Sequence, residues 1–298
     1  MKSLMHRFVL HNDHIRECSE KLLSPGQVGL LAGWGVFSTI RVSRGVLFAF
    51  ERHWARMQRD AGVLRVPFPS DPEYMRTRLL ELVTANQAED AVLRVVVVRN
   101  RGGTWEGPSD RDFDLIALTG DLHDWGAGAR LAVEHDARHA ACTYSGTKTI
   151  SWALNLAFLE EAQSRGFDEV LLLNECGEVS ECASANVFIS KGDQVWTPPL
   201  HSGCLPGVTR ELLLTEVRMV GITVGEKVLR LQDLEEADEV FITSTTRDLL
   251  PVLWIEGLEI RQAGTARSEL QRAFGRYLAA YVAQQKELVP SADREPPA

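Results

Sequence analysis

The sequence predicts an α+β protein with two domains. Strand-like apolar runs and helix-like amphipathic stretches occur in a mixed order, which is neither strictly alternating nor all-strand. The 298 residues, 45% of them apolar, suffice for one large or two medium cores. The stretch 121–129 (DLHDWGAGA) is small, polar and glycine-rich. We therefore expect domains over 1–120 and 130–286, a linker over 121–129, and a flexible tail over 287–298, where three prolines occur.

The elements of the first domain follow from residue type and period. β-Branched and aromatic runs at 36–42 and 46–50 flank Ser43-Arg44-Gly45, which predicts a hairpin. Helical spacing of apolar residues predicts helices over 51–63 and 71–86, the second with Ser70 as its N-cap. Further strands are expected at 7–12, 91–98 and 113–118. The intervening loop 99–111 is long enough to suggest a functional role.

The second domain is expected to mix five strands with three helices. The strands are predicted at 130–135, 169–173, 186–190, 194–197 and 241–243. The helices are predicted at 152–165, closed by Gly166, at 207–220, and at 265–286.

Composition excludes several classes of protein. The net charge of −9 argues against a nucleic-acid-binding surface, which would need clustered Lys and Arg. No apolar run reaches 18 residues and the start does not resemble a secretory signal, so we expect neither a membrane span nor export. Five irregularly spaced cysteines and eight scattered histidines predict neither disulfides nor a metal site, which favours the reducing cytoplasm.

Lys148 is the lysine most suited to amine chemistry. The chain has only six lysines, and the other five occur at a terminus, in a turn or in polar surroundings. Lys148 is flanked by small and hydroxyl residues (SGTKTIS) just before a largely apolar helix. A buried lysine has a lowered pKa and can act as a nucleophile or form a Schiff base. The alternative is an ordinary lysine with its stem packed on apolar surface and its amine in water.

An acid and two hydroxyl-rich segments accompany this lysine. Glu181 lies among small residues before a buried strand, where a carboxylate needs either a functional or a structural partner. The segment LPGVTR, with Gly207, Val208 and Thr209, opens a helix and offers its first N–H groups to an anion. The segment TSTT, with Ser244 and Thr245, follows a buried strand. Each could be a plain cap or turn, but together they suggest a phosphorylated cofactor.

Long ordered motifs resemble the class IV pyridoxal-phosphate aminotransferases. They are GWGVFSTIRVSRGVLFAFERHWARM, the run from SGTKTISWALNLAF to ECASANVFI, then GCLPGVTR and FITSTTRDLLPV, and the resemblance extends over residues 8–285. This family includes branched-chain and D-amino acid aminotransferases and aminodeoxychorismate lyase. The resemblance implies the two-domain fold of type IV pyridoxal-phosphate enzymes, like that of D-amino acid aminotransferase, and a homodimer whose partner helps to close the active site.

The resemblance also implies roles for individual residues. Lys148 matches the catalytic lysine that forms a Schiff base with pyridoxal 5′-phosphate, and Glu181 matches the acid at the pyridine nitrogen. Arg56 matches the arginine that pairs with the phosphate. The remaining cofactor-binding residues implied are Gly207, Val208, Thr209, Ser244 and Thr245.

The residues expected to face the substrate leave the reaction open. They are Phe37, Thr39, Arg41, Arg101 and Thr246. Branched-chain enzymes have a tyrosine where this chain has Ala32, and an acid and a glycine in place of Ser38 and Thr39, a pair closer to the lyase. We expect transfer of an amino group between a branched-chain or similar amino acid and a 2-oxo acid. The alternatives are aminodeoxychorismate lyase activity, releasing pyruvate and 4-aminobenzoate, and a cofactor-free binding protein. The sequence does not specify the donor, the acceptor or the L or D stereochemistry.

Overall fold

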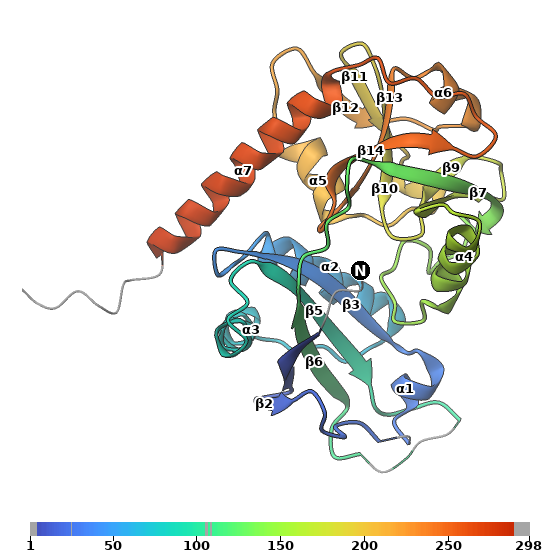
Figure 1. The fold of residues 1–298 in the computed structure, drawn as a ribbon. Helices are drawn as coiled ribbons and strands as arrows, with labels where there is room; N and C mark the ends of the chain where they lie inside the picture. Colours follow the sequence, from blue (N-terminus) through green and yellow to red (C-terminus); the bar gives the residue numbers. More distant parts are fainter. Residues whose placement is uncertain (1–4, 25, 105–106, 108, 289–298) are drawn as a thin grey trace, which may run out of the picture.

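The computed structural model describes residues 5–24, 26–104, 107 and 109–288. Its strands form two sheets, which Figure 1 displays as a lower and an upper lobe. The mixed α+β class predicted from the sequence is confirmed. Among the described residues, no helix combines the length and the apolar character needed to cross a membrane.

The N-terminal sheet is antiparallel and has the strand order β2-β1-β6-β5-β3-β4. Its strands are β1 (Met5–His11), β2 (His14–Glu17), β3 (Gly35–Ser43), β4 (Val46–Leu47), β5 (Ala91–Arg99) and β6 (Phe113–Gly120). Three helices belong to this lobe, α1 (Val28–Ala32), α2 (Phe50–Leu64) and α3 (Pro72–Ala85). Apolar residues of α2 and α3 join those of β3, β5 and β6 in one buried cluster. Strand β3 therefore has one face in this core, which leaves its other face for the second lobe.

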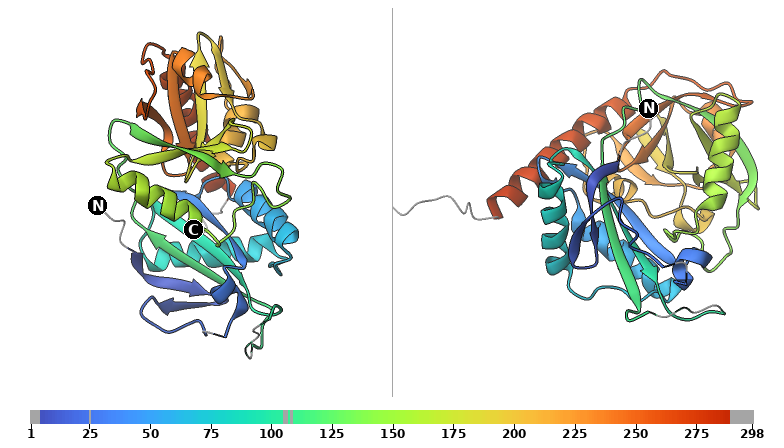
Figure 2. Two further views of the ribbon diagram at one scale, coloured as in Figure 1. Left: turned by 90° about the vertical axis from the view of Figure 1, so that its right-hand side faces the viewer. Right: turned by 60° about the horizontal axis from the view of Figure 1, so that its bottom comes forward.

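The C-terminal sheet is mixed, in the order β12-β11-β10-β13-β14-β7-β8-β9. Its strands are β7 (Ala129–Arg138), β8 (Glu169–Asn174), β9 (Val179–Cys182), β10 (Asn186–Lys191), β11 (Gln194–Thr197), β12 (Thr223–Glu226), β13 (Glu239–Ser244) and β14 (Asp248–Ile255). Its helices are α4 (Ala153–Ser164), the 3₁₀ turn η1 (Leu200–Ser202), α5 (Val208–Thr215), α6 (Leu231–Glu236) and α7 (Ala266–Leu288). Figure 2 shows α4 and α7 on different sides of the upper lobe.

Side-chain alternation buries both faces of the C-terminal sheet, which contributes to three apolar clusters. Phe188 and Phe241 stack with ring centroids 5.2 Å apart on the face covered by α5 and α7. Their neighbours Val187 and Ile242 join the cluster on the opposite face, where α6 packs. This two-sided burial explains why these strands read as continuous apolar runs in the sequence.

Helix α7 also contacts the N-terminal lobe. Phe48, just after β4, packs edge-to-face against Phe274 and Tyr281 at centroid distances of 5.9 and 5.2 Å. The Tyr281 hydroxyl donates a hydrogen bond of 2.7 Å to Glu51 at the start of α2. In Figure 1 this helix extends from the upper lobe down towards the lower one. The two lobes are thus in contact through Phe48, Glu51 and α7, which lie far in the sequence from the segment between β6 and β7.

Three predicted boundaries require correction. The second strand of the hairpin does not reach Phe50, because the backbone turns at Ala49 (φ 52°) and α2 begins at the next residue. The N-cap of α3 is Asp71 rather than Ser70, since the Asp71 carboxylate accepts the Tyr74 N–H at 2.9 Å. Helix α5 ends at Thr215 rather than 220, because the chain turns through Gly221 (φ 83°) to pair β12 with β11.

Several elements were not predicted, among them α1, α6, β2, β9, β12 and β14. The longest of these, β14, contains Pro251, which usually argues against a central strand. Residues 248–251 pair with β13 and residues 252–255 pair with β7, so Pro251 lies where the pairing changes partner. The predicted tail is partly wrong, because 287 and 288 continue α7, and residues 289–298 lie outside the described residues. The division into two domains with a linker over 121–129 stays a prediction.

Candidate active site

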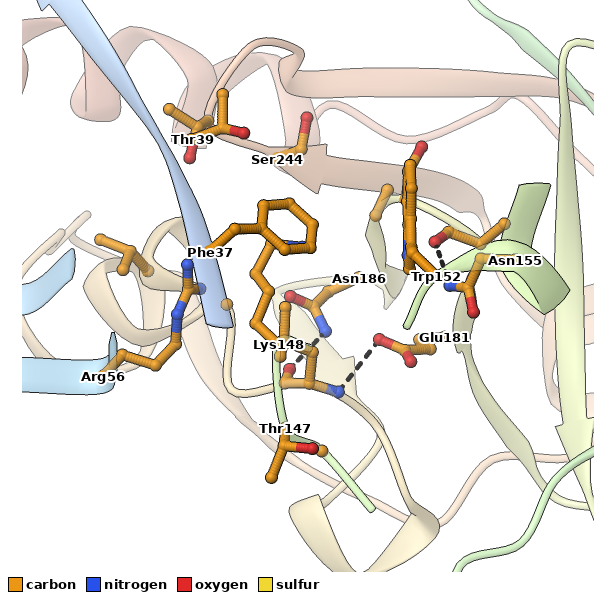
Figure 3. A pocket seen from close by; sticks show the side chains of 18 of the residues that line it. Phe37, Thr39, Arg56, Thr147, Lys148, Trp152, Asn155, Glu181, Asn186 and Ser244 are labelled. Carbon is orange, nitrogen blue, oxygen red and sulfur yellow. Dashed lines mark hydrogen bonds between the residues drawn. The ribbon is translucent and has the colours of Figure 1, made fainter. Parts of the chain in front are cut away.

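A cavity of about 400 Å³ lies between the two lobes. Both sheets contribute to its lining, through Phe37 of β3, Arg56 of α2 and Glu181 of β9, as does the 144–152 segment that contains Lys148 (Figure 3). Eleven of the predicted site residues line it: Phe37, Thr39, Arg56, Lys148, Glu181, Gly207, Val208, Thr209, Ser244, Thr245 and Thr246. Residues spread over more than 200 positions of the sequence therefore meet at one place.

The backbone around Lys148 is held by the N-terminal lobe. Its carbonyl accepts the Phe37 N–H at 3.0 Å, and Thr149 forms a bridge with Val36, so this segment extends the free edge of β3. The Lys148 N–H donates to the carboxylate of Asp60 at 3.0 Å. Asp60 is fully buried on α2 and also pairs with Arg59. Lys148 is thereby fixed at the seam between the lobes.

The amine of Lys148 occupies an apolar and cationic environment. Its Nζ lies 4.5 Å from the ring centroid of Phe37 and 5.9 Å from that of Trp152 (Figure 3). Among the described residues, no carboxylate lies within ion-pair distance of it. Burial, reinforced by the charge of Arg56, lowers the pKa of Lys148 to about 7. A substantial fraction of the side chain is therefore a neutral, nucleophilic amine near neutral pH.

Glu181 faces the cavity as a carboxylate with two fixed donors. Arg138 of β7 donates to Oε1 at 3.0 Å and the Leu205 N–H donates to Oε2 at 3.0 Å. Both partners stabilise negative charge on the buried acid. Leu205 in turn is held by Asn186, whose amide donates to the Leu205 carbonyl at 2.8 Å. The alternative considered from sequence, an internal salt bridge, is thus present, but it leaves the carboxylate in the cavity wall.

Arg56 and the first turn of α5 make the second polar region. Gly207 is the N-cap of α5 and has no side chain that could cap the helix. No N-cap side chain therefore accepts hydrogen bonds from the N–H groups of Val208 and Thr209. Arg56 donates weakly to the Pro206 carbonyl at 3.4 Å, while its Nε is buried without a partner. Burial lowers the pKa of Arg56 to about 10, and no described carboxylate forms an ion pair with it. A buried guanidinium beside a bare helix N-terminus is a site for an anion.

Two predicted substrate residues lie elsewhere. Arg41 pairs with Asp248 at 2.7 Å, and Arg101 pairs with Asp112 at 3.3 Å. Neither lines the cavity of the single chain, and each carries a carboxylate partner already. The predicted substrate residue Thr246, by contrast, lines the cavity together with Ser244. The Ser244 hydroxyl accepts the Arg247 N–H at 3.2 Å.

Three cavity arginines, Arg94, Arg138 and Arg247, were missed. Arg94 of β5 lies 4.5 Å from the Phe37 ring centroid and 5.9 Å from that of Trp152, and burial lowers its pKa. An arginine within the apolar run of β5 was a visible signal in the sequence. Arg138 gave no such signal, because only the fold brings it to Glu181, 43 residues away. The described residues contain no group of three or more His, Cys, Asp or Glu side chains that could hold a metal ion.

Comparison with known proteins identifies the family. The model of the class IV amino-transferases matches residues 35–255. A relative in Methanocaldococcus jannaschii, provisionally named a branched-chain-amino-acid aminotransferase, is 32% identical over 83% of this chain and 88% of its own. The D-alanine aminotransferase of Bacillus licheniformis is 28% identical over 85% of this chain and 89% of its own.

Solved structures share the fold. A branched-chain aminotransferase from the archaeon Thermoproteus uzoniensis, solved with norvaline, superimposes with a TM-score of 0.83 at 24% identity, covering 95% of this chain and 97% of that one. A provisionally named 4-amino-4-deoxychorismate lyase from Legionella pneumophila gives 0.80 at 21% identity, covering 87% and 96%. The chain belongs to the class IV aminotransferases, as the sequence motifs predicted, and it is a pyridoxal-phosphate-dependent enzyme of that class.

The lowered pKa of Lys148 predicts a specific pH dependence of stability without cofactor. Below pH 7 the folded protein carries a buried charge, so the Lys148→Met variant should have a higher free energy of unfolding than the wild type. Between about pH 7 and the unfolded-state pKa of 10.5, the unfolded wild type binds the extra proton, so its stability should rise relative to the variant. In this pH range, the free energy of unfolding of the wild type relative to the variant should rise by up to about 1.4 kcal/mol per pH unit. Urea unfolding at several pH values measures this difference, and a difference that stays constant with pH would contradict the assignment.

Proposed function

We propose that this cavity is where the enzyme moves an amino group between a branched-chain or similar amino acid and a 2-oxo acid. One observation carries the proposal. A buried lysine whose pKa is about 7 lies between a carboxylate, Glu181, and an anion site at Arg56 and α5. Pyridoxal 5′-phosphate has three matching features, an aldehyde, a ring nitrogen that binds a proton, and a phosphate.

The residues present fit this cofactor. The guanidinium of Arg56, with its buried Nε unpaired, and the first-turn N–H groups of α5 offer several donors to a phosphate dianion. Thr209, nearly fully buried, adds a hydroxyl to the same wall. Gly207 has no room for a side chain, because a Cβ there would overlap the amide oxygen of Asn186. The glycine and asparagine together thus define the position of this helix end.

Lys148 and Glu181 are the protein residues that we expect to take part in the reaction. When bound, the cofactor acts as an electron sink for negative charge at the substrate α-carbon. The amine of Lys148 would hold the cofactor through its aldehyde carbon, and when free it would accept a proton from the substrate α-carbon and return it. The carboxylate of Glu181, held by Arg138 and the Leu205 N–H, stabilises a proton on the ring nitrogen.

Arg94 is the residue that we assign to a substrate carboxylate. It lines the cavity beside Phe37 and Trp152, and no described carboxylate pairs with it. A half-buried cation that contacts only aromatic faces gains a strong partner when a carboxylate enters. Phe37 and Trp152 then provide the apolar surface that a branched-chain side group would contact.

The main test is a substrate panel. We expect the holoenzyme to transfer amino groups from L- or D-amino acids to 2-oxoglutarate or pyruvate, and Lys148→Ala to abolish both turnover and the absorption band of the attached cofactor. Incubation with aminodeoxychorismate tests the lyase alternative, which the Legionella structure supports only at the level of the fold. Turnover of natural substrates by Lys148→Ala would refute the proposal, and 4-aminobenzoate as the sole product would favour the lyase.

Glu181→Gln should slow removal of the α-proton by orders of magnitude. The amide has nearly the same volume but no negative charge, so the ring nitrogen should lose its proton and the electron sink weaken. Cofactor attachment to Lys148 should persist. Single-turnover kinetics with α-deuterated substrate should show a larger isotope effect than in the wild type. A wild-type rate in this variant would reduce Glu181 to a structural acid.

We also propose a homodimer in the cytoplasm. Five free cysteines are consistent with a reducing compartment. Leu154 and Leu156 of α4 are 72% and 50% exposed, and Asn155 between them lines the cavity. A second copy that covers these leucines would lie beside the cavity mouth and complete its wall.

The dimer is tested by mass in solution. Light scattering should give twice the chain mass of 33.2 kDa for the wild type. The double variant Leu154→Asp/Leu156→Asp should shift towards the single-chain mass, because it places charge in an apolar contact. Val220→Asp is the matched control, since Val220 is 98% exposed. A double variant that remains dimeric would place the interface elsewhere.

A further inference from the structure

A buried serine links Arg56 to a buried histidine. Ser38 of β3 is fully buried, and its hydroxyl oxygen lies 2.8 Å from Nη2 of Arg56 and 2.8 Å from Nδ1 of His53. His53 and Arg56 are three residues apart on α2, so they project from the same face of the helix towards β3. Ser38 points away from the cavity that its neighbours Phe37 and Thr39 line, as strand alternation requires.

The direction of these hydrogen bonds follows from the number of hydrogens. A guanidinium can only donate, so the Ser38 oxygen accepts from Arg56. The hydroxyl has one hydrogen, and the only other described partner within reach is Nδ1 of His53. A neutral His53 with its hydrogen on Nε2 accepts that hydrogen at Nδ1, which gives all three groups a partner. This agrees with burial and with the cations Arg56 and Lys148, which together hold the pKa of His53 well below its usual range.

The arrangement fixes the guanidinium without cancelling its charge. Ser38 and neutral His53 are both uncharged, and the nearest acid on the helix, Asp60, is occupied by Arg59 and by the Lys148 N–H. An acid in the place of Ser38 would hold Arg56 just as well, but it would also neutralise it. The full positive charge is left for a ligand.

We propose that Ser38 and His53 are positioning residues, which orient Arg56 from behind and keep its charge available for the phosphate of the cofactor. The inference rests on the proposed function of this cavity. It separates two tasks: Arg56 contacts the phosphate, whereas Ser38 and His53 act only through Arg56. Their loss should then affect the recognition of a phosphate and spare the recognition of the rest of the cofactor.

Equilibrium binding of two ligands tests this division. Pyridoxal 5′-phosphate and pyridoxal, which lacks the phosphate, are titrated into the cofactor-free protein, and the ratio of their dissociation constants is compared among variants. Arg56→Met should raise the dissociation constant for the phosphorylated ligand about tenfold to a hundredfold. Ser38→Ala and His53→Phe should each raise it about tenfold, with less than about a twofold change for pyridoxal.

A double variant and a matched control make the test specific. In the Arg56→Met background, Ser38→Ala should have no further effect, because its only route to the ligand is gone. Ser38→Thr, which keeps the hydroxyl, should retain most of the phosphate preference. Ser43→Ala makes the same change at another buried position of β3 and should leave both constants unchanged.

The outcomes separate this inference from the function on which it rests. If Ser38→Ala and His53→Phe weaken both ligands equally, or neither, the positioning role is wrong while the cofactor site stands. If Ser38→Ala weakens binding of the phosphorylated ligand in the Arg56→Met background as much as it does in the wild type, Ser38 acts independently of Arg56. The inference then fails as well. If the wild type binds neither ligand, or shows no preference for the phosphate, the cofactor assignment itself is overturned.

Discussion

Positive charge buried without a matching carboxylate is the constraint around which this cavity is organised. Of the cavity cations, Arg138 and Arg247 have acids beside them, Glu181 and Glu169. Lys148, Arg56 and Arg94 have none within ion-pair distance among the described residues. Burying such charges costs free energy that other parts of the fold must offset. A ligand with a phosphate and a carboxylate relieves that cost at two of the three positions.

The two lobes are therefore coupled through the ligand site as well as through their packing. Lys148 lies after β7 in the sequence, yet its backbone is held by β3 and by Asp60 of the first lobe. Glu181 and α5 belong entirely to the second lobe. Contacts between Phe48 and α7 join the lobes on another side. A shift of one lobe against the other would separate Lys148 and Arg56, which the first lobe holds, from Glu181 and the first turn of α5.

Sequence reasoning found the residues that stand out by type and missed those that depend on the fold. Lys148 and Glu181 are unusual in their local surroundings, and the glycine before α5 marks a helix start. Ser38 stood out in the sequence only as a departure from the branched-chain enzymes, and its link to Arg56 and His53 arises only where α2 lies against β3. Arg41 and Arg101 were predicted from resemblance alone, and in the single chain they pair with Asp248 and Asp112 and do not line the cavity. Strand β14 escaped prediction because Pro251 is tolerated where the strand exchanges one neighbour for another.

The same charges explain how ligand binding and lysine chemistry are linked. Arg56 is the second cause, after burial, of the lowered pKa of Lys148. A dianion bound at Arg56 compensates that charge, so the remaining depression comes mainly from burial against Phe37 and Trp152. A bound phosphate would therefore raise the pKa of Lys148 above its value in the cofactor-free protein, and the amine would become a stronger base. Keeping Arg56 uncompensated by any protein carboxylate is what makes the pKa of the lysine respond to the bound anion.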